Sequence, residues 1–307
     1  MTKVFIDGSA GTTGLRIFDR LKGREDIELI TLSEALRKDT EARRDALNSA
    51  DIAFLCLPDA AAIEAVSLIE NGNTAIIDTS TAHRTHVLWT YGFPEINGKR
   101  EEIRKSKRVA NPGCHASGFI ATVAPLIEAG VIKDDEMLSC FSLTGYSGGG
   151  KGMIAEYEGE DRDLLLSAPR QYALTQSHKH LKEMSAVTGL TVLPVFCPIV
   201  APFYSGMEVT VPLHREQLKC SLNDLEEIYR DYYKNGLVSF EKSYSQNGFL
   251  SASSLSNKDN MIISAFGNDD RIILAALYDN LGKGASGSAI QNMNILLGVD
   301  EKTGLEL

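Results

Sequence analysis

Hydrophobic residues in the first hundred positions form short continuous runs that alternate with longer stretches of helical spacing. The runs predict strands, and one of them, IAFLCL at 52–57, is apolar on both faces, as an interior parallel strand is. Strands that alternate with helices of about ten residues predict right-handed βαβ crossovers and a parallel sheet. The expected strands are 3–8, 27–32, 51–58 and 74–80, and the expected helices are 14–23, 41–50 and 61–72. This part of the chain therefore predicts a Rossmann-type, doubly wound α/β domain.

After residue 114 the pattern changes to longer, strand-rich segments, several with alternating hydrophobicity. One clear helix, 221–236, lies between them, with Ser221 or Asn223 as its N-cap. Long strands with few helices predict a largely antiparallel second domain of the α+β class. The closing helix, 286–298, is too short and apolar to stand alone, so we expect it to pack against the first domain. The strand-rich segments are 136–152, 190–213, 236–244 and 260–281.

These two patterns divide the chain of 307 residues into two domains. The first is expected to cover 1–113 and to be completed by the C-terminal segment 283–307. The second is expected to cover 114–282.

Composition and charge argue against several classes of function. Hydrophobic residues make up 43% and charged residues 23%, the balance of a globular protein. The net charge of −10 argues against nucleic acid or an anionic membrane as the main partner, so an anionic substrate needs a local basic site. No apolar run approaches the roughly 18 residues of a membrane span, and no signal peptide precedes the first strand.

The five cysteines are widely spread and include no CxxC pair. This spacing predicts neither a zinc site nor a disulfide framework, and we expect no metal. Reduced thiols fit a cytoplasmic protein. The positions are Cys56, Cys114, Cys140, Cys197 and Cys220.

The stretch DGSAGTTGLRI, residues 7–17, joins the first strand to the first helix. Its glycines give GxxGxxG, a variant of the dinucleotide fingerprint, in which the backbone approaches a pyrophosphate at the helix N-terminus. Because the loop opens a βαβ series, it predicts nucleotide binding; the alternative is a plain tight turn. The residues expected to contact the cofactor are Gly8, Ser9, Gly11, Thr12, Thr13 and Gly14.

The region after the second strand bears on the choice of cofactor. NAD sites usually place an acid about 20 residues past the glycines, and Glu34 lies there. Arg37 and Lys38 follow closely, and two cations at this position suit a 2′-phosphate. We therefore expect NADP, supplied as NADPH; the alternative for these cations is a solvated helix start.

The stretch ANPGCHASGF, residues 110–119, places a thiol after two backbone-breaking residues and at the start of a helical pattern. Cys114 is therefore expected at a helix N-terminus, where unpaired N–H groups and the helix dipole favour a thiolate. The alternative is a buried small hydrophobe, the common fate of a free cysteine. Joined to a nicotinamide domain, a thiolate suggests attack on an activated acyl carbon, followed by hydride transfer to the thioester.

Such chemistry needs an acid or a base. The stretch SHKHLKE offers His178 and His180 at a predicted helix start, with Ser177 as a candidate cap, although either histidine can also be a surface residue. His115 adjoins the thiol in sequence, but on a helix it points about 100° away from it.

Two further stretches offer anion-binding groups. TGYSGGGKG, residues 144–152, is a glycine-rich loop whose N–H groups and Lys151 can receive a carboxylate or phosphate. Arg84 follows the fourth strand at its carboxyl end, where open α/β sheets hold ligands. A flexible linker and an exposed turn arginine are the respective alternatives.

Taken together, these motifs resemble those of the N-acetyl-γ-glutamyl-phosphate reductases of arginine biosynthesis, in their shorter, second type. The resemblance implies a Rossmann NADP-binding domain and a catalytic and dimerisation domain like that of glyceraldehyde-3-phosphate dehydrogenase. It implies NADPH-dependent reduction of N-acetyl-5-glutamyl phosphate to N-acetylglutamate 5-semialdehyde, with release of phosphate. It runs almost end to end and rests on GSAGTTG, CLPDAAA, IIDTSTAHR, YGFPEING, NPGCHASGF, TGYSGGGKG, SHKHLKEM and DNLGKGASGSAIQNMN.

The resemblance also implies roles for particular residues. Cys114 matches the nucleophile, and His178 matches the acid/base partner, with Lys179 in place of the family's arginine. We expect His178 either to protonate the departing thiohemiacetal oxygen as an imidazolium or to orient the thiolate, and His180 is the alternative acid/base. Ser205 stands where the longer type has an arginine, so no phosphate-binding role is transferred to that segment. The residues that match the substrate region are Arg84, Ser147, Gly148 and His180. Those that match the segment returning to the cofactor are Asn280, Lys283 and Gly284.

Two alternatives remain. A related enzyme, aspartate-semialdehyde dehydrogenase or N-acetylaminoadipyl-phosphate reductase, uses the same machinery on another acyl phosphate. A catalytically silent NADPH-sensing regulator keeps the glycine loop but has no need of the thiol. The family favours homo-oligomers, here a dimer or tetramer, and the apolar strands of the second domain offer a surface for them.

Overall fold

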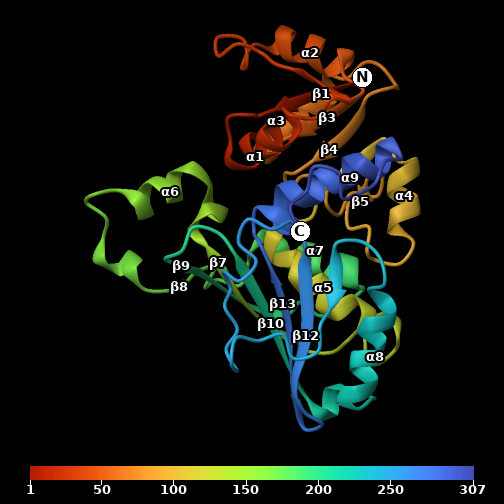
Figure 1. Cartoon of the computed structure of the whole chain (residues 1–307), viewed down its shortest axis with the longest axis vertical. Coiled ribbons are helices and arrows are strands. Elements are labelled where there is room, and N and C mark those ends of the chain that lie inside the picture. The colour runs from red at the N-terminus through yellow and green to blue at the C-terminus, as the bar shows by residue number, and fades with distance from the viewer. The chain divides into compact units, whose positions relative to one another are not determined.

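The computed structural model describes all 307 residues, and its internal contacts divide the chain into two compact units (Figure 1). The first unit comprises residues 1–112 and 285–305, and the second comprises 113–284 and 306–307. The segment 285–305 thus belongs to the first unit although it follows the second in sequence.

A six-stranded, all-parallel sheet forms the centre of the first unit, in the order β2-β1-β3-β4-β6-β5. Its four predicted strands and three predicted helices are present, whereas β5, β6 and α4 are too short to leave a periodic signal. The strands are β1 (Thr2–Asp7), β2 (Ile27–Ile30), β3 (Ile52–Leu55), β4 (Ala75–Asp78), β5 (Thr90–Tyr91) and β6 (Arg108–Ala110). The helices are α1 (Thr12–Leu21), α2 (Thr40–Ser49), α3 (Asp59–Ser67), α4 (Lys99–Lys105) and α9 (Gly287–Leu297).

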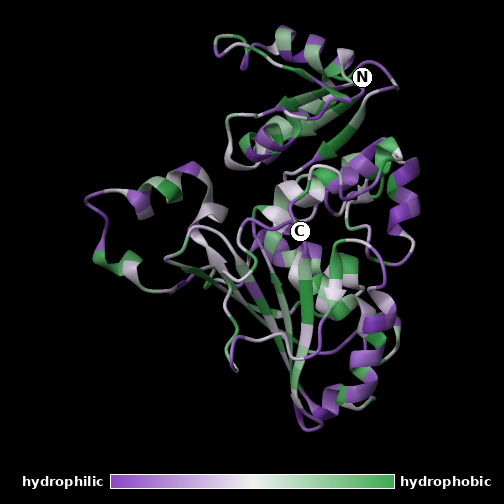
Figure 2. Cartoon of the chain, in the orientation of Figure 1, coloured by the Kyte–Doolittle hydropathy of each residue, from purple (hydrophilic) through white to green (hydrophobic).

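Apolar side chains cover both faces of this sheet, and its strands are accordingly green in Figure 2. On one face, Phe54 packs in a cluster with Ile17 of α1 and Met293 of α9. On the other face, Leu55 packs in a cluster with Leu47 of α2 and residues of α3. The closing helix therefore completes the core of the first unit.

The second unit is built on a seven-stranded sheet in the order β11-β12-β13-β10-β7-β9-β8. The sheet is mixed, because β7 pairs with β9 and β11 pairs with β12 in parallel. The other four strand pairs are antiparallel, so the expectation of a largely antiparallel domain is confirmed. The two parallel pairs were not predicted, because alternating hydrophobicity does not show in which direction two strands pair. The strands are β7 (Ser139–Gly145), β8 (Arg170–Gln171), β9 (Val195–Ala201), β10 (Met207–His214), β11 (Val238–Phe240), β12 (Met261–Asn268) and β13 (Arg271–Tyr278).

Four helices complete the second unit: α5 (Cys114–Glu128), α6 (Gly150–Glu158), α7 (Lys179–Thr188) and α8 (Leu222–Tyr232). Helix α5 packs on β10 and β13 and contacts α7, while α8 packs on β12. The N-cap of α8 is Ser221, one of the two predicted caps, in a capping box with Asp224. Helix α6 projects beyond the β8–β9 edge (Figure 1). The glycine-rich stretch expected as a loop is instead a 3-10 turn, Tyr146–Gly149, that leads directly into α6.

Candidate active site

Cys114 is the first residue of α5, so the prediction that its thiol lies at a helix N-terminus is confirmed. Gly113, in extended backbone, is the N-cap, and no side chain caps the helix. The N–H groups of the first turn and the positive end of the dipole therefore favour a thiolate here. Cys114 is half-buried rather than sealed in the core. This argues for the reactive interpretation over the buried small hydrophobe.

Two buried side chains fix the backbone around the thiol. The Gly113 N–H donates to Glu183 Oε1 at 2.7 Å. The Tyr278 hydroxyl donates to the Cys114 carbonyl at 2.5 Å and accepts from the Gly118 N–H at 3.1 Å. Sequence reasoning missed Glu183 and Tyr278, because contacts between residues 70 and 160 positions apart leave no local pattern. The only sequence signal for the role of Glu183 is that it follows His178 on the same predicted helix.

Gly284 lies directly against Cys114. A Cβ at this position would lie 3.1 Å from Cys114 Cβ and 3.1 Å from the Asp279 carbonyl oxygen, so the close approach favours glycine. The resemblance grouped Gly284 with Asn280 and Lys283 in a cofactor segment. The structure places all three in the second unit, where the Lys283 side chain is fully buried.

Three histidines gather in the second unit beside the start of α5. The ring centroid of His115 lies 5.9 Å from that of His178 and 5.5 Å from that of His180. His178 is the N-cap of α7, since its Nδ1 accepts from the His180 N–H at 3.2 Å. The expected cap, Ser177, was wrong, because the imidazole nitrogen of the next residue takes this role. His115, expected to point away from the thiol, joins the other two histidines.

Electrostatics favour neutral rings at His115 and His178. Burial lowers the pKa of His115 to about 3, with smaller contributions from His178 and Lys179. Burial and then the Lys179 charge also lower the pKa of His178. The capping bond acts in the same direction, because it uses the Nδ1 lone pair that a proton would occupy. Burial, the Lys179 charge and the capping bond therefore all favour a neutral imidazole at His178, with its proton on Nε2.

The structure brings Asn280 together with Ser147 and Gly148, which are distant from it in sequence. Asn280 Nδ2 donates to Ser147 Oγ at 3.0 Å, and Asn280 Oδ1 accepts from the Gly206 N–H at 2.9 Å. A Cβ at Gly148 would lie 3.4 Å from Asn280 Nδ2. Asn280 thus fixes the 3-10 turn of the glycine-rich stretch, while Lys151 on α6 is exposed.

In the first unit, the glycine loop lies at the carboxyl end of β1 and opens α1. Gly8 has φ +88°, and a Cβ there would lie 2.2 Å from the Cys56 carbonyl oxygen. A Cβ at Gly14 would lie 2.4 Å from the Gly8 carbonyl oxygen. Gly11 is the N-cap of α1, no side chain caps this helix, and Ser9, Thr12 and Thr13 are at least partly exposed. The loop therefore offers an open helix N-terminus that fits a pyrophosphate.

The predicted cations of the first unit differ in their surroundings. Arg37 and Lys38 are exposed in the connection between β2 and α2, where Arg37 pairs with Glu34 at 2.8 Å. Arg84 is half-buried after β4. It donates to the carbonyl oxygens of Asn111 and Thr79, each at 3.0 Å. Arg84 thus braces the segment that leads to Cys114, a contact the sequence did not indicate.

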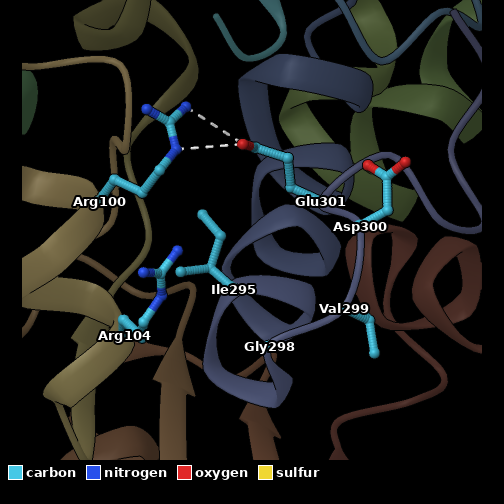
Figure 3. A pocket seen from close by; sticks show the side chains of 7 residues that line it. All are labelled: Arg100, Arg104, Ile295, Gly298, Val299, Asp300 and Glu301. Carbon is cyan, nitrogen blue, oxygen red and sulfur yellow. Dashed lines mark hydrogen bonds and ion pairs between the residues drawn. The ribbon is translucent and has the colours of Figure 1, made fainter.

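A surface pocket of the first unit contains none of the predicted site residues. It lies between α4 and the segment after α9, and Arg100 forms an ion pair with Glu301 across it at 3.1 Å (Figure 3). Arg104, also in its lining, pairs with Glu101. The ion pair between Arg100 and Glu301 thus ties the segment after α9 to α4. No group of three or more His, Cys, Asp or Glu side chains is arranged to hold a metal ion, and none of the helices is long and apolar enough to cross a bilayer.

Two family models match the chain. One is described as the NAD-binding domain of semialdehyde dehydrogenases and matches residues 3–106. The other is described as the semialdehyde dehydrogenase dimerisation domain and matches residues 114–280.

Curated relatives match over nearly the full length. The chain is 43% identical to N-acetyl-γ-glutamyl-phosphate reductase 2 of Nostoc sp., over 99% of both chains. It is 45% identical to the N-acetyl-γ-glutamyl-phosphate reductase of Brucella ovis, over 96% of this chain and 99% of that one.

Solved structures share the fold at low identity. Aspartate semialdehyde dehydrogenase II of Vibrio cholerae, complexed with ASA, superposes with a TM-score of 0.72 at 15% identity, over 97% of this chain and 98% of that chain. The Candida albicans aspartate semialdehyde dehydrogenase with NADP superposes with a TM-score of 0.70 at 15% identity, over 97% of this chain and 98% of that chain.

Proposed function

The chain belongs to the N-acetyl-γ-glutamyl-phosphate reductase family, and from this premise we propose that it reduces N-acetyl-L-glutamyl 5-phosphate to N-acetyl-L-glutamate 5-semialdehyde, releasing phosphate. The single observation that carries the proposal is a half-buried thiol at the uncapped N-terminus of α5, beside a histidine cluster. A free-standing NADPH sensor has no need of this arrangement. The reaction belongs to arginine biosynthesis, as the names of the relatives imply, and the five free cysteines suit a reducing cytoplasm.

The first half of the reaction uses Cys114. Its thiolate attacks the acyl carbon, the bond between that carbon and the phosphate oxygen breaks, and phosphate leaves with the electron pair. The product is a thioester on Cys114. N–H groups at the start of α5 stabilise the oxyanion that forms on the way.

The second half regenerates the thiol. Bound NADPH supplies a hydride for the thioester carbon. The carbon–sulfur bond then breaks, so that the aldehyde leaves and Cys114 recovers its electron pair. His178, neutral and with its proton on Nε2, serves as a hydrogen-bond donor to the substrate oxygen. This replaces the imidazolium expected from the sequence, because burial and the capping bond both oppose protonation.

For the substrate, the test is the reverse reaction with NADP⁺ and phosphate. N-acetylglutamate 5-semialdehyde, aspartate semialdehyde and N-acetylaminoadipate semialdehyde are compared by kcat/KM. We expect the first to exceed each of the others by about a hundredfold or more, the discrimination available to a site whose polar groups a wrong substrate leaves unpaired. A preference for either of the others would show that the chain is a related semialdehyde dehydrogenase.

For the cofactor, we propose NADP rather than NAD. Strands β1 and β2 pair in parallel, so the glycine loop and the connection that carries Arg37 and Lys38 leave the same edge of the sheet. Replacing both cations by alanine is expected to weaken NADPH binding about tenfold or more while leaving NADH binding unchanged. Lys22→Ala, at the exposed C-terminus of α1, is the control that leaves both unchanged.

For the assembly, we propose a homodimer or a tetramer built from such dimers. The face of the second sheet turned away from its helices carries apolar residues, among them Phe141, Val195 and Ile273, with exposed fractions of 44%, 54% and 44%. We propose that a second copy of this chain covers this face. The family model that matches residues 114–280 is described as a dimerisation domain, which supports the proposal.

A further inference from the structure

Arg170, the first residue of β8, is a half-buried arginine whose charge has no partner within the protein. Its guanidinium forms no ion pair and no hydrogen bond, and its Nε is buried. Acidic side chains are abundant in a chain with a net charge of −10. A half-buried cation that pairs with none of them therefore points to a partner outside the chain.

Aromatic side chains hold this guanidinium in place. Its central carbon lies 5.8 Å from the centroid of the Tyr157 ring, which is a cation–π distance. The Tyr157 ring in turn stacks on Tyr146, with centroids 4.8 Å apart. The Tyr157 hydroxyl is also buried without a hydrogen-bond partner. Two polar groups in contact with each other thus lack partners, and one of them is charged.

The strand registers place Arg170 in the row of the second sheet that leads to the glycine-rich turn. Arg170 pairs with Val200, and Val200 pairs with Thr144; the side chains of Val200 and Thr144 are buried. Directly paired residues share a face of a sheet, so Arg170 lies on this inner face. Thr144 is followed, after one residue, by the turn Tyr146–Gly149, which holds two of the predicted substrate residues.

The neighbouring row of the same face leads to the thiol. Ser142, His115 and Tyr172 form a hydrogen-bonded chain there. Ser142 Oγ lies 2.6 Å from His115 Nδ1, and the Tyr172 hydroxyl lies 2.6 Å from His115 Nε2. His115 directly follows Cys114, and Arg170 lies two residues, or about 7 Å along an extended chain, from Tyr172. Arg170 is thus on the side of the sheet that carries the site, but it is not adjacent to Cys114.

We propose that Arg170 is a substrate-binding residue and that its guanidinium receives the α-carboxylate of the substrate. The planar fork of a guanidinium matches a carboxylate in a bidentate pair. The α-carboxylate fits this place better than the phosphate does, because several bonds separate it from the acyl carbon, whereas the phosphate is attached to that carbon. The proposal rests on the proposed function only in taking a substrate that has a free α-carboxylate.

The test uses the reverse reaction, in which the carboxylate and the phosphate belong to separate molecules. Arg170→Gln removes both the charge and the fork. We expect the KM for N-acetylglutamate 5-semialdehyde to rise about ten- to hundredfold, the size of a hydrogen bond to a charged group. The KM values for phosphate and NADP⁺ are expected to stay unchanged. Arg170→Lys keeps the charge without the fork and is expected to give a smaller rise.

An analogue without the carboxylate shows whether the pairing is direct. In 4-acetamidobutanal a hydrogen replaces the α-carboxylate of the semialdehyde. The parent protein is expected to lose about ten- to hundredfold in kcat/KM on this analogue. Arg170→Gln is expected to use the analogue as well as the parent protein does, because the group that Arg170 binds is missing. A general disturbance of the site would lower the rate with both aldehydes.

Arg162→Gln is the matched control, because Arg162 is an exposed arginine between α6 and β8 and the change of charge is the same. Its KM values are expected to equal those of the parent protein. An unchanged KM for the semialdehyde in Arg170→Gln overturns the proposal, as does an equal loss on 4-acetamidobutanal. A rise confined to phosphate assigns Arg170 to the leaving group and overturns it too. If Arg170→Gln does not fold, Arg170→Lys is compared on the two aldehydes in the same way.

These outcomes are separate from those of the proposed function. A parent protein that prefers aspartate semialdehyde would contradict the proposed function. Because that aldehyde also has an α-carboxylate, the KM of Arg170→Gln for it would still test the role of Arg170.

Discussion

The His178 side chain has a structural role and a proposed catalytic role, and a substitution can separate the two. Its Nδ1 caps α7, and its Nε2–H is the proposed donor to the substrate. Asparagine is also a good N-cap, so His178→Asn is expected to leave the free energy of unfolding nearly unchanged and to lower kcat about a hundredfold. His178→Ala is expected to lose the cap as well, at a cost of about 1 kcal/mol. Chemical denaturation and steady-state kinetics on both variants check this; near-normal turnover in His178→Asn would remove the histidine from the chemistry.

Cys114 is the proposed nucleophile, and trapping its thioester tests this role directly. With the acyl phosphate present and NADPH absent, the mass of the protein is expected to rise by one acyl group, on the peptide that contains Cys114. Cys114→Ser is expected to lose the adduct and about three orders of magnitude or more in turnover. Cys220 is a partly buried thiol near the start of α8. Cys220→Ser is therefore the control, and it is expected to keep the adduct and the normal turnover. An adduct on any other residue contradicts the mechanism.

Helix α7 is the element that organises the second unit's part of the site. His178, His180 and Glu183 all lie within its first turn and a half. The Glu183 carboxylate accepts a hydrogen bond from the N–H of Gly113, the N-cap of α5. The N-terminus of α5 is thereby tied to the middle of α7 through one buried carboxylate. A periodic pattern places these three residues on α7 but does not say which helix they meet.

The glycine loop is the proposed binding site for the pyrophosphate of the cofactor, and two alanine variants distinguish an effect on folding from an effect on binding. At Gly11 the nearest atom to a new Cβ is 3.4 Å away, so Gly11→Ala is expected to fold normally. Its methyl group would cover the backbone that a pyrophosphate approaches, so the Kd for NADPH, measured by fluorescence titration, should rise about tenfold or more. Gly8→Ala combines a positive φ with a 2.2 Å contact and is expected to lower the melting temperature as well. Unaltered NADPH binding in Gly11→Ala would place the cofactor elsewhere.

At the scale of the whole molecule, the uncovered face of the second sheet predicts the assembly. Replacing Phe141 and Ile273 by glutamate puts charges on this face, so the double variant is expected to be a monomer by light scattering where the parent protein is a dimer or tetramer. Phe249→Glu, a substitution on a loop residue with 76% of its side chain exposed, is the control expected to keep the parent mass. A double variant with the parent mass would rule out this face.

The sequence by itself predicted the longer strands and helices and the place of Cys114 at a helix N-terminus. Continuous apolar runs predicted β1, β3 and β4, because an interior parallel strand is buried on both faces. Pro112 and Gly113 predicted the start of α5 at Cys114, because both residues act on the local backbone. The motifs also predicted the family, since a fixed order of short stretches needs no contacts to be recognised.

Only the tertiary structure decided how distant residues meet. The parallel pairing of β7 with β9, the contact of Glu183 with Gly113 and the chain from Ser142 to Tyr172 all depend on packing across many residues. The protonation of the histidines was decided there too, because burial and the capping bond arise only once α7 is in place. Local sequence sets backbone preferences and periodicity, whereas desolvation and side-chain partners are properties of the folded chain.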